Sequence, residues 1–365
     1  MSALWWSYLL VIAGSTLSCI GWQKIGRRYR PQHAGHGHLG RRLFSSTDPG
    51  SQVVLVAVLI APVSSKIRPL AGGREELLPV ATTLILLVAV GVAGRFLGMH
   101  PSWNPGSELA GAVFLWSADL GVALTNSESV NLALTVIWLT AVANAFRYAD
   151  WSSRHAAGLA AIVSLTLFVL AATGGQVLVS TLAAGLTGCV IGFLLYSTRF
   201  ESLLLGTSGS GIIGFTIAFL AIQVREPASY EESMINALTP ILACSYTLFN
   251  LLLFLAGRLF LMGGSATAWT RPPSGHTPDN ARLPSLWRSW SLSIATLIGI
   301  LSFVVFRLKP IPAVLLVCII GLAYLGVGVT LLRTDPTISA QWQQLACSIE
   351  GNTANKRDPQ IHRVP

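Results

Sequence analysis

The chain has 365 residues, of which 52% are hydrophobic and only 11% are charged, and its mean hydropathy is +0.62. A soluble domain usually carries about 25% charged residues. This composition therefore excludes an ordinary soluble protein and indicates one that crosses a membrane several times. The net charge of +9 raises the question of nucleic acid binding, which the distribution of the basic residues answers.

Apolar segments along the chain predict an all-α, polytopic membrane helix bundle with about eleven transmembrane helices. Most segments approach the roughly 20 residues that a helix needs to cross a bilayer, although the second is short. The first lacks a basic flank and a clear cleavage site, so we expect a retained helix rather than a signal peptide. The expected spans cover residues 3–20, 52–64, 78–97, 108–125, 129–147, 156–173, 177–196, 208–224, 237–263, 289–306 and 312–332.

The basic residues indicate the orientation of these spans. With the N-terminus outside, the inner loops and the C-terminal tail hold 18 of the 24 Lys and Arg residues. This positive-inside pattern predicts a cytoplasmic C-terminus, and it means that the charge reflects topology rather than nucleic acid. We expect residues 1–335 to form a single transmembrane domain and residues 336–365 a polar cytoplasmic tail. The basic residues left outside are Lys66, Arg68, Arg74, Arg225, Arg307 and Lys309.

Two polar features each have two interpretations. His33, His36 and His38 could bind a metal, but the small residues between them favour a flexible loop, because a metal site needs fixed ligands. Asp119 falls within the expected span 108–125, and an ionisable residue inside a membrane is a functional hypothesis. It would serve a small-solute transporter, or it would be a protonated or paired carboxyl facing the bundle.

A group of polar residues stands at the cytoplasmic end of the fifth expected span and in the loop after it. These residues are Asn144, Arg147, Asp150, Arg154 and His155. Such a group suits an anionic head group at the membrane surface. The alternative is an ordinary charged interfacial loop, which would need no particular order of residues.

A glycine-rich turn precedes the eighth expected span, with the sequence Gly206-Thr207-Ser208-Gly209-Ser210. Free backbone N–H groups and the dipole at the start of a helix suit a phosphate. The same residues also suit a plain helix start in which Ser208 or Ser210 is the cap.

The order of these segments resembles a known superfamily, the polyprenyl-phosphate N-acetylhexosamine-1-phosphate transferases. Asn144-Ala145-Phe146, Asp150 and Gly158-Leu159 resemble its N-A-F-N-x-x-D-G-x-D-G-L segment, and residues 205–215 resemble its F-M-G-D-x-G-S-x-x-x-G-F segment. The superfamily includes undecaprenyl-phosphate N-acetylglucosamine-1-phosphate transferases and phospho-N-acetylmuramoyl-pentapeptide transferases. Four more segments match in the same order, over about residues 1–335: Lys24-Ile25-Gly26 with Pro31, residues 91–96, residues 237–247 and residues 277–283.

Most acids of the superfamily motifs are replaced in this chain. The superfamily uses Mg²⁺ to neutralise a pyrophosphate, and Mg²⁺ requires carboxylate oxygens. Asp150 and Asp279 are the acids that remain near the expected cleft. The replacements are Ala93-Gly94 for the D-D pair, Ser153 for the second Asp of D-G-x-D, Thr207 for the Asp of G-D-x-G-S, Thr247 for the Asp of P-x-x-D, and Arg282 at the start of the histidine cluster.

The resemblance implies a protein of cell-wall or lipopolysaccharide biosynthesis in the bacterial inner membrane. Because the acids are replaced, we expect a non-catalytic homologue without a cofactor, which binds polyprenyl phosphate or another envelope-biosynthesis membrane protein. The alternative is an active, divergent transferase with Asp150 as catalytic residue, Mg²⁺ and a UDP-sugar. The residues expected to bind substrate are Arg95, Asn144, Arg147, Arg154, Gly206, Thr207, Ser208, Gly209, Ser210, Asp279 and Arg282.

Overall fold

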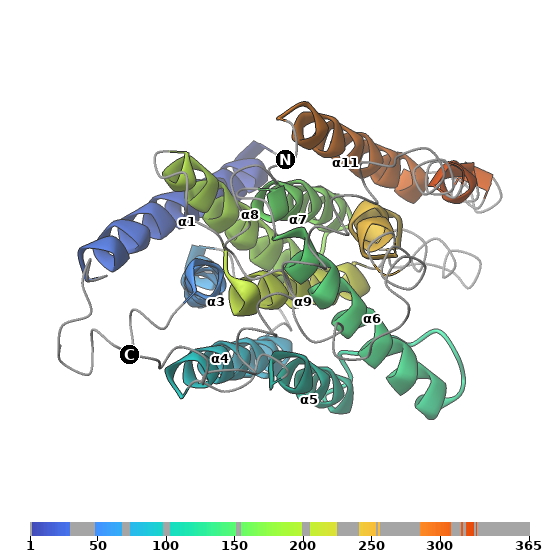
Figure 1. Cartoon of the computed structure of the whole chain (residues 1–365), viewed down its shortest axis with the longest axis horizontal. Coiled ribbons are helices and arrows are strands. Elements are labelled where there is room, and N and C mark those ends of the chain that lie inside the picture. Colours follow the sequence, from blue (N-terminus) through green and yellow to red (C-terminus); the bar gives the residue numbers. More distant parts are fainter. Residues whose placement is uncertain are drawn as a thin grey trace, which may run out of the picture.

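The computed structural model describes residues 2–29, 48–67, 74–97, 103–150, 155–198, 205–224, 241–252, 255, 285–307, 315–316, 319–324 and 326. Nearly all of these residues are helical, and no strand occurs among them (Figure 1). The expected all-α class is therefore confirmed for this part of the chain. The tail 336–365 lies outside it.

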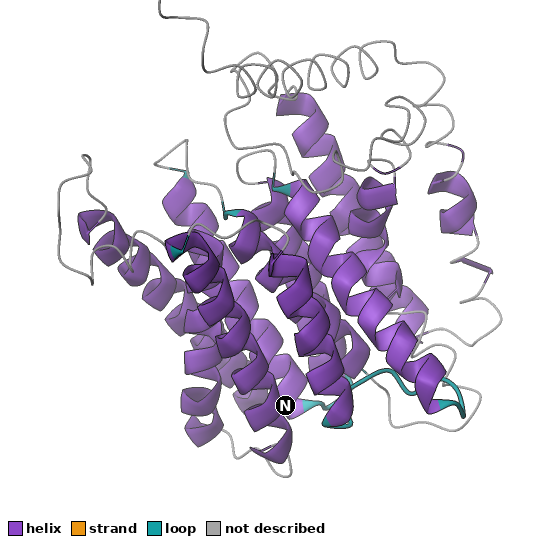
Figure 2. Ribbon diagram, turned by 60° about the horizontal axis from the view of Figure 1, so that its bottom comes forward, coloured by secondary structure: helices purple, strands orange, loops and turns teal. Residues whose placement is uncertain are grey.

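The helices follow the expected spans closely in the first two thirds of the chain. Their bounds are α1 (Ser2–Tyr29), α3 (Pro49–Ile67), α4 (Arg74–Phe96), α5 (Trp103–Ser117), α6 (Glu128–Ala149), α7 (His155–Thr173), α8 (Val177–Ser197), α9 (Thr207–Gln223) and α11 (Ser285–Arg307). A shorter apolar helix covers Ile241–Leu252. The helices run side by side (Figure 2).

Four helices in the described part are long and apolar enough to cross a membrane. They are α6, α7, α8 and the part of α4 from Leu77 to Phe96. This finding supports a membrane protein. The total of eleven spans and the orientation of the termini remain predictions.

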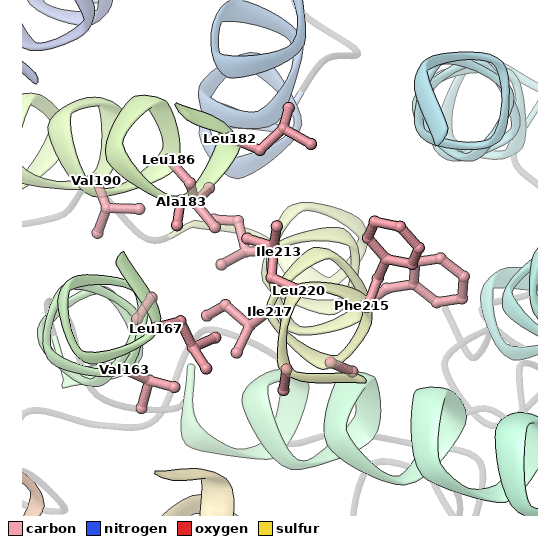
Figure 3. Close-up of a cluster of buried hydrophobic side chains, with 14 of the residues drawn as sticks. Val163, Leu167, Leu182, Ala183, Leu186, Val190, Ile213, Phe215, Ile217 and Leu220 are labelled. Atoms are coloured by element: carbon pink, nitrogen blue, oxygen red, sulfur yellow. The ribbon is translucent and has the colours of Figure 1, made fainter. Parts of the chain in front are cut away.

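Helix α9 lies in the middle of the bundle, because its sequence is apolar on every side and so favours burial on every side. Its neighbours include α3, α6, α7 and α8. Ile213 and Ile217 point toward Leu167 of α7 and Leu186 of α8 (Figure 3). Phe215 points away from them, and its ring tip lies 3.4 Å from where a side chain on Gly111 of α5 would begin.

Helices α1 and α8 approach each other closely at two glycines of α8. A Cβ on Gly192 would lie 2.6 Å from the backbone oxygen of Thr16, and one on Gly188 would overlap the backbone of Ile12. The close approach allows the Thr16 hydroxyl to donate to the Gly188 carbonyl over 2.9 Å. Small residues permit this packing where lipid supplies little hydrophobic drive between helices.

The connections between α6, α7, α8 and α9 are short, so consecutive helices run in opposite directions. At one end of the bundle Gln176 donates to the Gln223 carbonyl over 3.0 Å. Gln223 in turn donates to the Leu120 carbonyl over 2.8 Å. The start of α9 and the end of α6 therefore lie together at the opposite end.

The prediction that Asp119 lies within a helix over residues 108–125 is wrong. Helix α5 ends at Ser117, and Asp119 stands in the turn after it with φ +58° and an exposed side chain. Apolar residues on both sides of this turn raise the local hydropathy and hide it from a sequence window. The turn itself is held because the Val122 N–H donates to the Thr135 hydroxyl over 2.9 Å.

Candidate functional site

The first turn of α9 is where the polar residues of the bundle meet. Gly206 precedes the helix with φ +86°, a left-handed conformation that favours glycine. A Cβ on Gly206 would overlap the Asp48 carboxylate. Residues of α3, α4, α5 and α6 surround this turn, and we call the group around it the polar cluster. Its members are Asp48, Arg95, Asn104, Glu108, Asn144, Arg147, Asp150 and residues 205–210.

Asp150 joins the end of α6 to the start of α9. Its carboxylate accepts the Gly206 N–H over 2.9 Å and the Leu205 N–H over 3.3 Å. Burial raises the pKa of Asp150 well above its usual range, against these two donors, and the nearby charge of Asp48 raises it further. The backbone N–H groups of Leu205 and Gly206, which could otherwise bind a phosphate, therefore already donate to Asp150.

Asp48 joins the start of α3 to the same turn. Gly50 and Gly209 touch through their backbones, since a Cβ on Gly209 would lie 2.6 Å from the Gly50 Cα. This contact places the Asp48 carboxylate where it accepts the Ser208 N–H over 3.2 Å. The same carboxylate forms an ion pair with Arg95 of α4. Asp48 is 3% exposed, whereas the Arg95 side chain is 43% exposed.

Arg147 forms the second ion pair of the polar cluster, with Glu108 of α5. Both residues are buried. Arg147 also donates to the Asn144 side chain and, over 3.1 Å, to the Thr207 carbonyl. A Cβ on Gly211 would overlap the guanidinium of Arg147, so the absence of a side chain there makes room for the pair.

Ser208 is held from two further helices. Asn104 of α5 donates to its hydroxyl over 3.1 Å. Gly91 of α4 packs against it, since a Cβ there would lie 3.1 Å from the Ser208 Cβ. Ser210 turns back into its own helix and donates to the Gly206 carbonyl over 2.8 Å. The start of α9 is thus fixed by α3, α4, α5 and α6 together.

The structure brings together most of the residues that the sequence pointed to. Arg95, Asn144, Arg147, Asp150 and the turn 206–210 all belong to the polar cluster. The other expected residues, Arg154, Asp279 and Arg282, lie outside the described residues, as do His33, His36 and His38.

Sequence reasoning missed Asp48 and Glu108. Asp48 carries a usable local signal, because an Asp followed by Pro49 is a frequent helix start. Glu108 is the first residue of the expected span 108–125, and no sequence pattern near it predicts its pairing with Arg147.

The fold and this cluster define a class: a helical membrane protein with arginines and carboxylates gathered at one end of the bundle. Comparisons with known proteins narrow this class further. A model of the family described as glycosyl transferase family 4 matches residues 77–225, a range that begins in the first turn of α4 and ends just after α9. In this range the chain is similar to the polyprenyl-phosphate sugar-1-phosphate transferase superfamily, as its motifs predict.

Two curated proteins show the same relationship. The "Probable undecaprenyl-phosphate N-acetylglucosaminyl 1-phosphate transferase" of Bacillus subtilis (strain 168) is 34% identical over 89 residues, which are 24% of this chain and 25% of that protein. The "Phospho-N-acetylmuramoyl-pentapeptide-transferase" of Moorella thermoacetica is 31% identical over 186 residues, 51% of this chain and 51% of that protein. The matches therefore span about a quarter and about half of these relatives.

Proposed function

We propose that this protein is a non-catalytic homologue of the sugar-1-phosphate transferases in the bacterial inner membrane, and that it binds a polyprenyl phosphate at the polar cluster. The proposal rests on one observation: the chain keeps the glycines and the order of the superfamily motifs, but most acids of those motifs are replaced. Thr207, the first residue of α9, stands where the resembling motif has an aspartate. Ala93 and Gly94, in the last turn of α4, stand where the motif has two more.

Of the replaced positions, Thr207 belongs to the polar cluster, and Ala93 and Gly94 directly precede its member Arg95. The Thr207 carbonyl accepts a hydrogen bond from Arg147, and its hydroxyl can donate to a phosphate oxygen. A neutral hydroxyl does not supply the negative charge that holds Mg²⁺. Phosphoryl transfer depends on that neutralising charge, so the site is better suited to binding than to the reaction.

The neighbourhood of Arg95 suits a lipid head group. Arg95 lies in the last turn of α4 and is partly exposed, as expected for an arginine that reaches the membrane surface. Ala93 is exposed, and a Cβ on Gly94 would meet no described atom within 4 Å. A phosphate at head-group depth can therefore approach the guanidinium from this side.

The names of the relatives supply the class of ligand. One is named for undecaprenyl phosphate and the other for a phospho-N-acetylmuramoyl-pentapeptide. Both names describe phosphate-linked substrates of envelope assembly. A membrane protein of the same assembly is a further partner that this location would allow.

A second candidate is an active, divergent transferase that uses a UDP-sugar and Mg²⁺. The observation in its favour is that Asp48 joins Asp150 at the start of α9, which gives the site a second acid that the motifs do not include. In that case Asp150 would be the catalytic residue. The transporter hypothesis loses its support, because Asp119 is exposed in a turn.

One experiment separates binding from transfer. The full-length protein in nanodiscs is incubated with UDP-N-acetylglucosamine, undecaprenyl phosphate and Mg²⁺, and both bound lipid and released UMP are measured. We expect retention of undecaprenyl phosphate but not of undecaprenol, and no UMP. Release of UMP that disappears in Asp150→Asn would show an active enzyme. Equal retention of the phosphate and the alcohol would overturn the lipid-phosphate proposal.

A further inference from the structure

The carboxylates of the polar cluster are already held by donors from within the protein. Asp48 is paired with Arg95, and Glu108 is paired with Arg147. Asp150 accepts two backbone N–H groups. Three carboxylates therefore stand beside two guanidinium groups, so the cluster contains cations of its own although they do not outnumber the carboxylates.

This donor set does not fit a resident Mg²⁺ ion. Mg²⁺ demands oxygen ligands in octahedral geometry at 2.0–2.1 Å, and it is bound through carboxylates that no other cation occupies. Asp48 and Glu108 each have an arginine in that place. In the part of the chain that the structure describes, no group of three His, Cys, Asp or Glu residues is arranged to hold a metal ion.

We propose that the arginines replace the divalent cation of the related transferases, and that Arg95 binds a phosphate monoester directly, without a metal, by exchanging its Asp48 partner for the phosphate. This inference rests on the proposed function, and it adds how the ligand is held. It assigns different tasks to the two arginines. Arg95 contacts the ligand, while Arg147 stays in its buried pair.

The exposure of the two ion pairs supports this division. Arg95 is 43% exposed and follows Gly94, where a Cβ would meet no described atom within 4 Å, so its guanidinium can turn toward a ligand. A guanidinium binds phosphate in the same bidentate manner as carboxylate. Arg147 is 7% exposed and has three protein acceptors, on Glu108, Asn144 and Thr207.

Asp48 can lose its arginine without being left unpaired. Its carboxylate keeps the Ser208 N–H, 3.2 Å away, at the positive end of the α9 dipole. The exchange therefore trades one charge-assisted contact of Arg95 for another. It also makes Asp48 a competitor of the ligand, so removing the charge of Asp48 should strengthen binding.

The test measures equilibrium binding of radiolabelled undecaprenyl phosphate to the full-length protein in nanodiscs, with either EDTA or Mg²⁺. We expect the same affinity in both conditions. Arg95→Ala should weaken binding about tenfold or more, the effect of one lost charged hydrogen bond. Arg307→Ala, which removes a cation from the expected outer side of the membrane, is the control and should leave the affinity unchanged.

Asp48→Asn should increase the binding affinity, an effect that misfolding cannot produce. The amide oxygen can still accept the Ser208 N–H, but the charge that holds Arg95 is gone. We expect binding to become about tenfold tighter, the reverse of the loss in Arg95→Ala. Unchanged or weaker binding by a folded Asp48→Asn variant would overturn the exchange.

The remaining outcomes separate this inference from the proposed function. Binding that EDTA abolishes and Mg²⁺ restores would overturn the metal-free mode and leave lipid-phosphate binding intact. No binding in either condition would overturn the proposed function itself. Inorganic phosphate is the probe for the source of the phosphate group: competition at concentrations similar to the lipid's would assign Arg95 to free phosphate and overturn the lipid as its ligand.

Discussion

The two arginines of the polar cluster form ion pairs of different energetic character. Arg95 is partly exposed although its partner Asp48 is buried, so Arg95 can exchange this partner more easily than an arginine of a fully buried pair. Arg147 and Glu108 are both buried, and the second oxygen of Glu108 is buried without a hydrogen-bond partner in the described structure. A buried pair with an unsatisfied oxygen specifies geometry more than it stabilises the fold.

A double-mutant cycle tests this view of the buried pair. We expect Glu108→Leu and Arg147→Met each to destabilise the protein by about 3–5 kcal/mol, because the remaining charge is buried alone. The double variant should recover most of the loss. Thermal unfolding in detergent gives the measurement, and Glu128→Leu is the control because Glu128 is exposed. A Glu108→Leu variant as stable as the wild type would show that Arg147 reaches water.

Residue order in the sequence was sufficient to group Asn144, Arg147 and Asp150 with the turn at 206–210. These residues belong to short motifs, and the structure places the motifs in contact. Asp48 and Glu108 could not be grouped in this way. Each contacts a partner that is distant along the chain. Such pairs depend on contacts between helices, such as Gly50 against Gly209, which no local sequence pattern predicts.

At the scale of helices, close packing positions α8, and α8 helps to bury α9. Glycines at 188 and 192 bring α8 onto α1, and α3 and α7 pack on α8 as well. Burial of α8 is extensive, and the Ser164 and Thr187 hydroxyls hydrogen-bond between α7 and α8 over 3.0 Å. The packing of α1 therefore affects the core and not only the edge of the bundle.

Two glycine substitutions on α8 separate packing from helix propensity. In Gly192→Ala the new Cβ meets the Thr16 backbone at 2.6 Å, so we expect a loss of about 1–3 kcal/mol from overpacking. In Gly185→Ala the nearest atom is the Ala57 oxygen at 3.7 Å, and we expect no loss or a gain of up to about 1 kcal/mol. Thermal unfolding of the two variants in one detergent measures both. Equal loss in the two variants would contradict the packing argument.

Hydropathy predicted most helices but misplaced one. The expected spans 129–147, 156–173 and 177–196 lie within α6, α7 and α8. The expected span 108–125 is instead α5, Trp103–Ser117, followed by a turn. Asn104 and Glu108, in the first two turns of α5, have polar partners on other helices, and hydropathy cannot predict such partners.

At the scale of the whole molecule, the two ends of the bundle differ in charge. The end with Leu120, Gln176 and Gln223 is held by amide hydrogen bonds, and its described charged residues include the acids Asp119 and Glu128. The opposite end holds the ion pairs of Arg95 and Arg147. The positive-inside rule then predicts that the polar cluster faces the cytoplasm.

Cysteine labelling from the two sides of the membrane tests this orientation. Ser127 precedes α6 at the end of the bundle with Gln223, Thr198 follows α8 at the end with the polar cluster, and both side chains are exposed. Single cysteines are introduced at these positions after Cys318 and Cys347 are replaced by serine, because Cys19, Cys189 and Cys244 are buried. A membrane-impermeant maleimide applied to intact spheroplasts should label Ser127→Cys and leave Thr198→Cys unlabelled.

Permeabilised cells provide the control for this labelling, since both cysteines should then react. Labelling of Thr198→Cys alone in intact spheroplasts would reverse the orientation and place Arg95 and Asp48 on the outer face. A UDP-sugar made in the cytoplasm could not reach the cluster there, so the divergent-transferase candidate would fail. A polyprenyl phosphate could still bind from the outer leaflet. A cluster on the outer face would therefore exclude the transferase candidate, whereas a cytoplasmic cluster is compatible with both candidate functions.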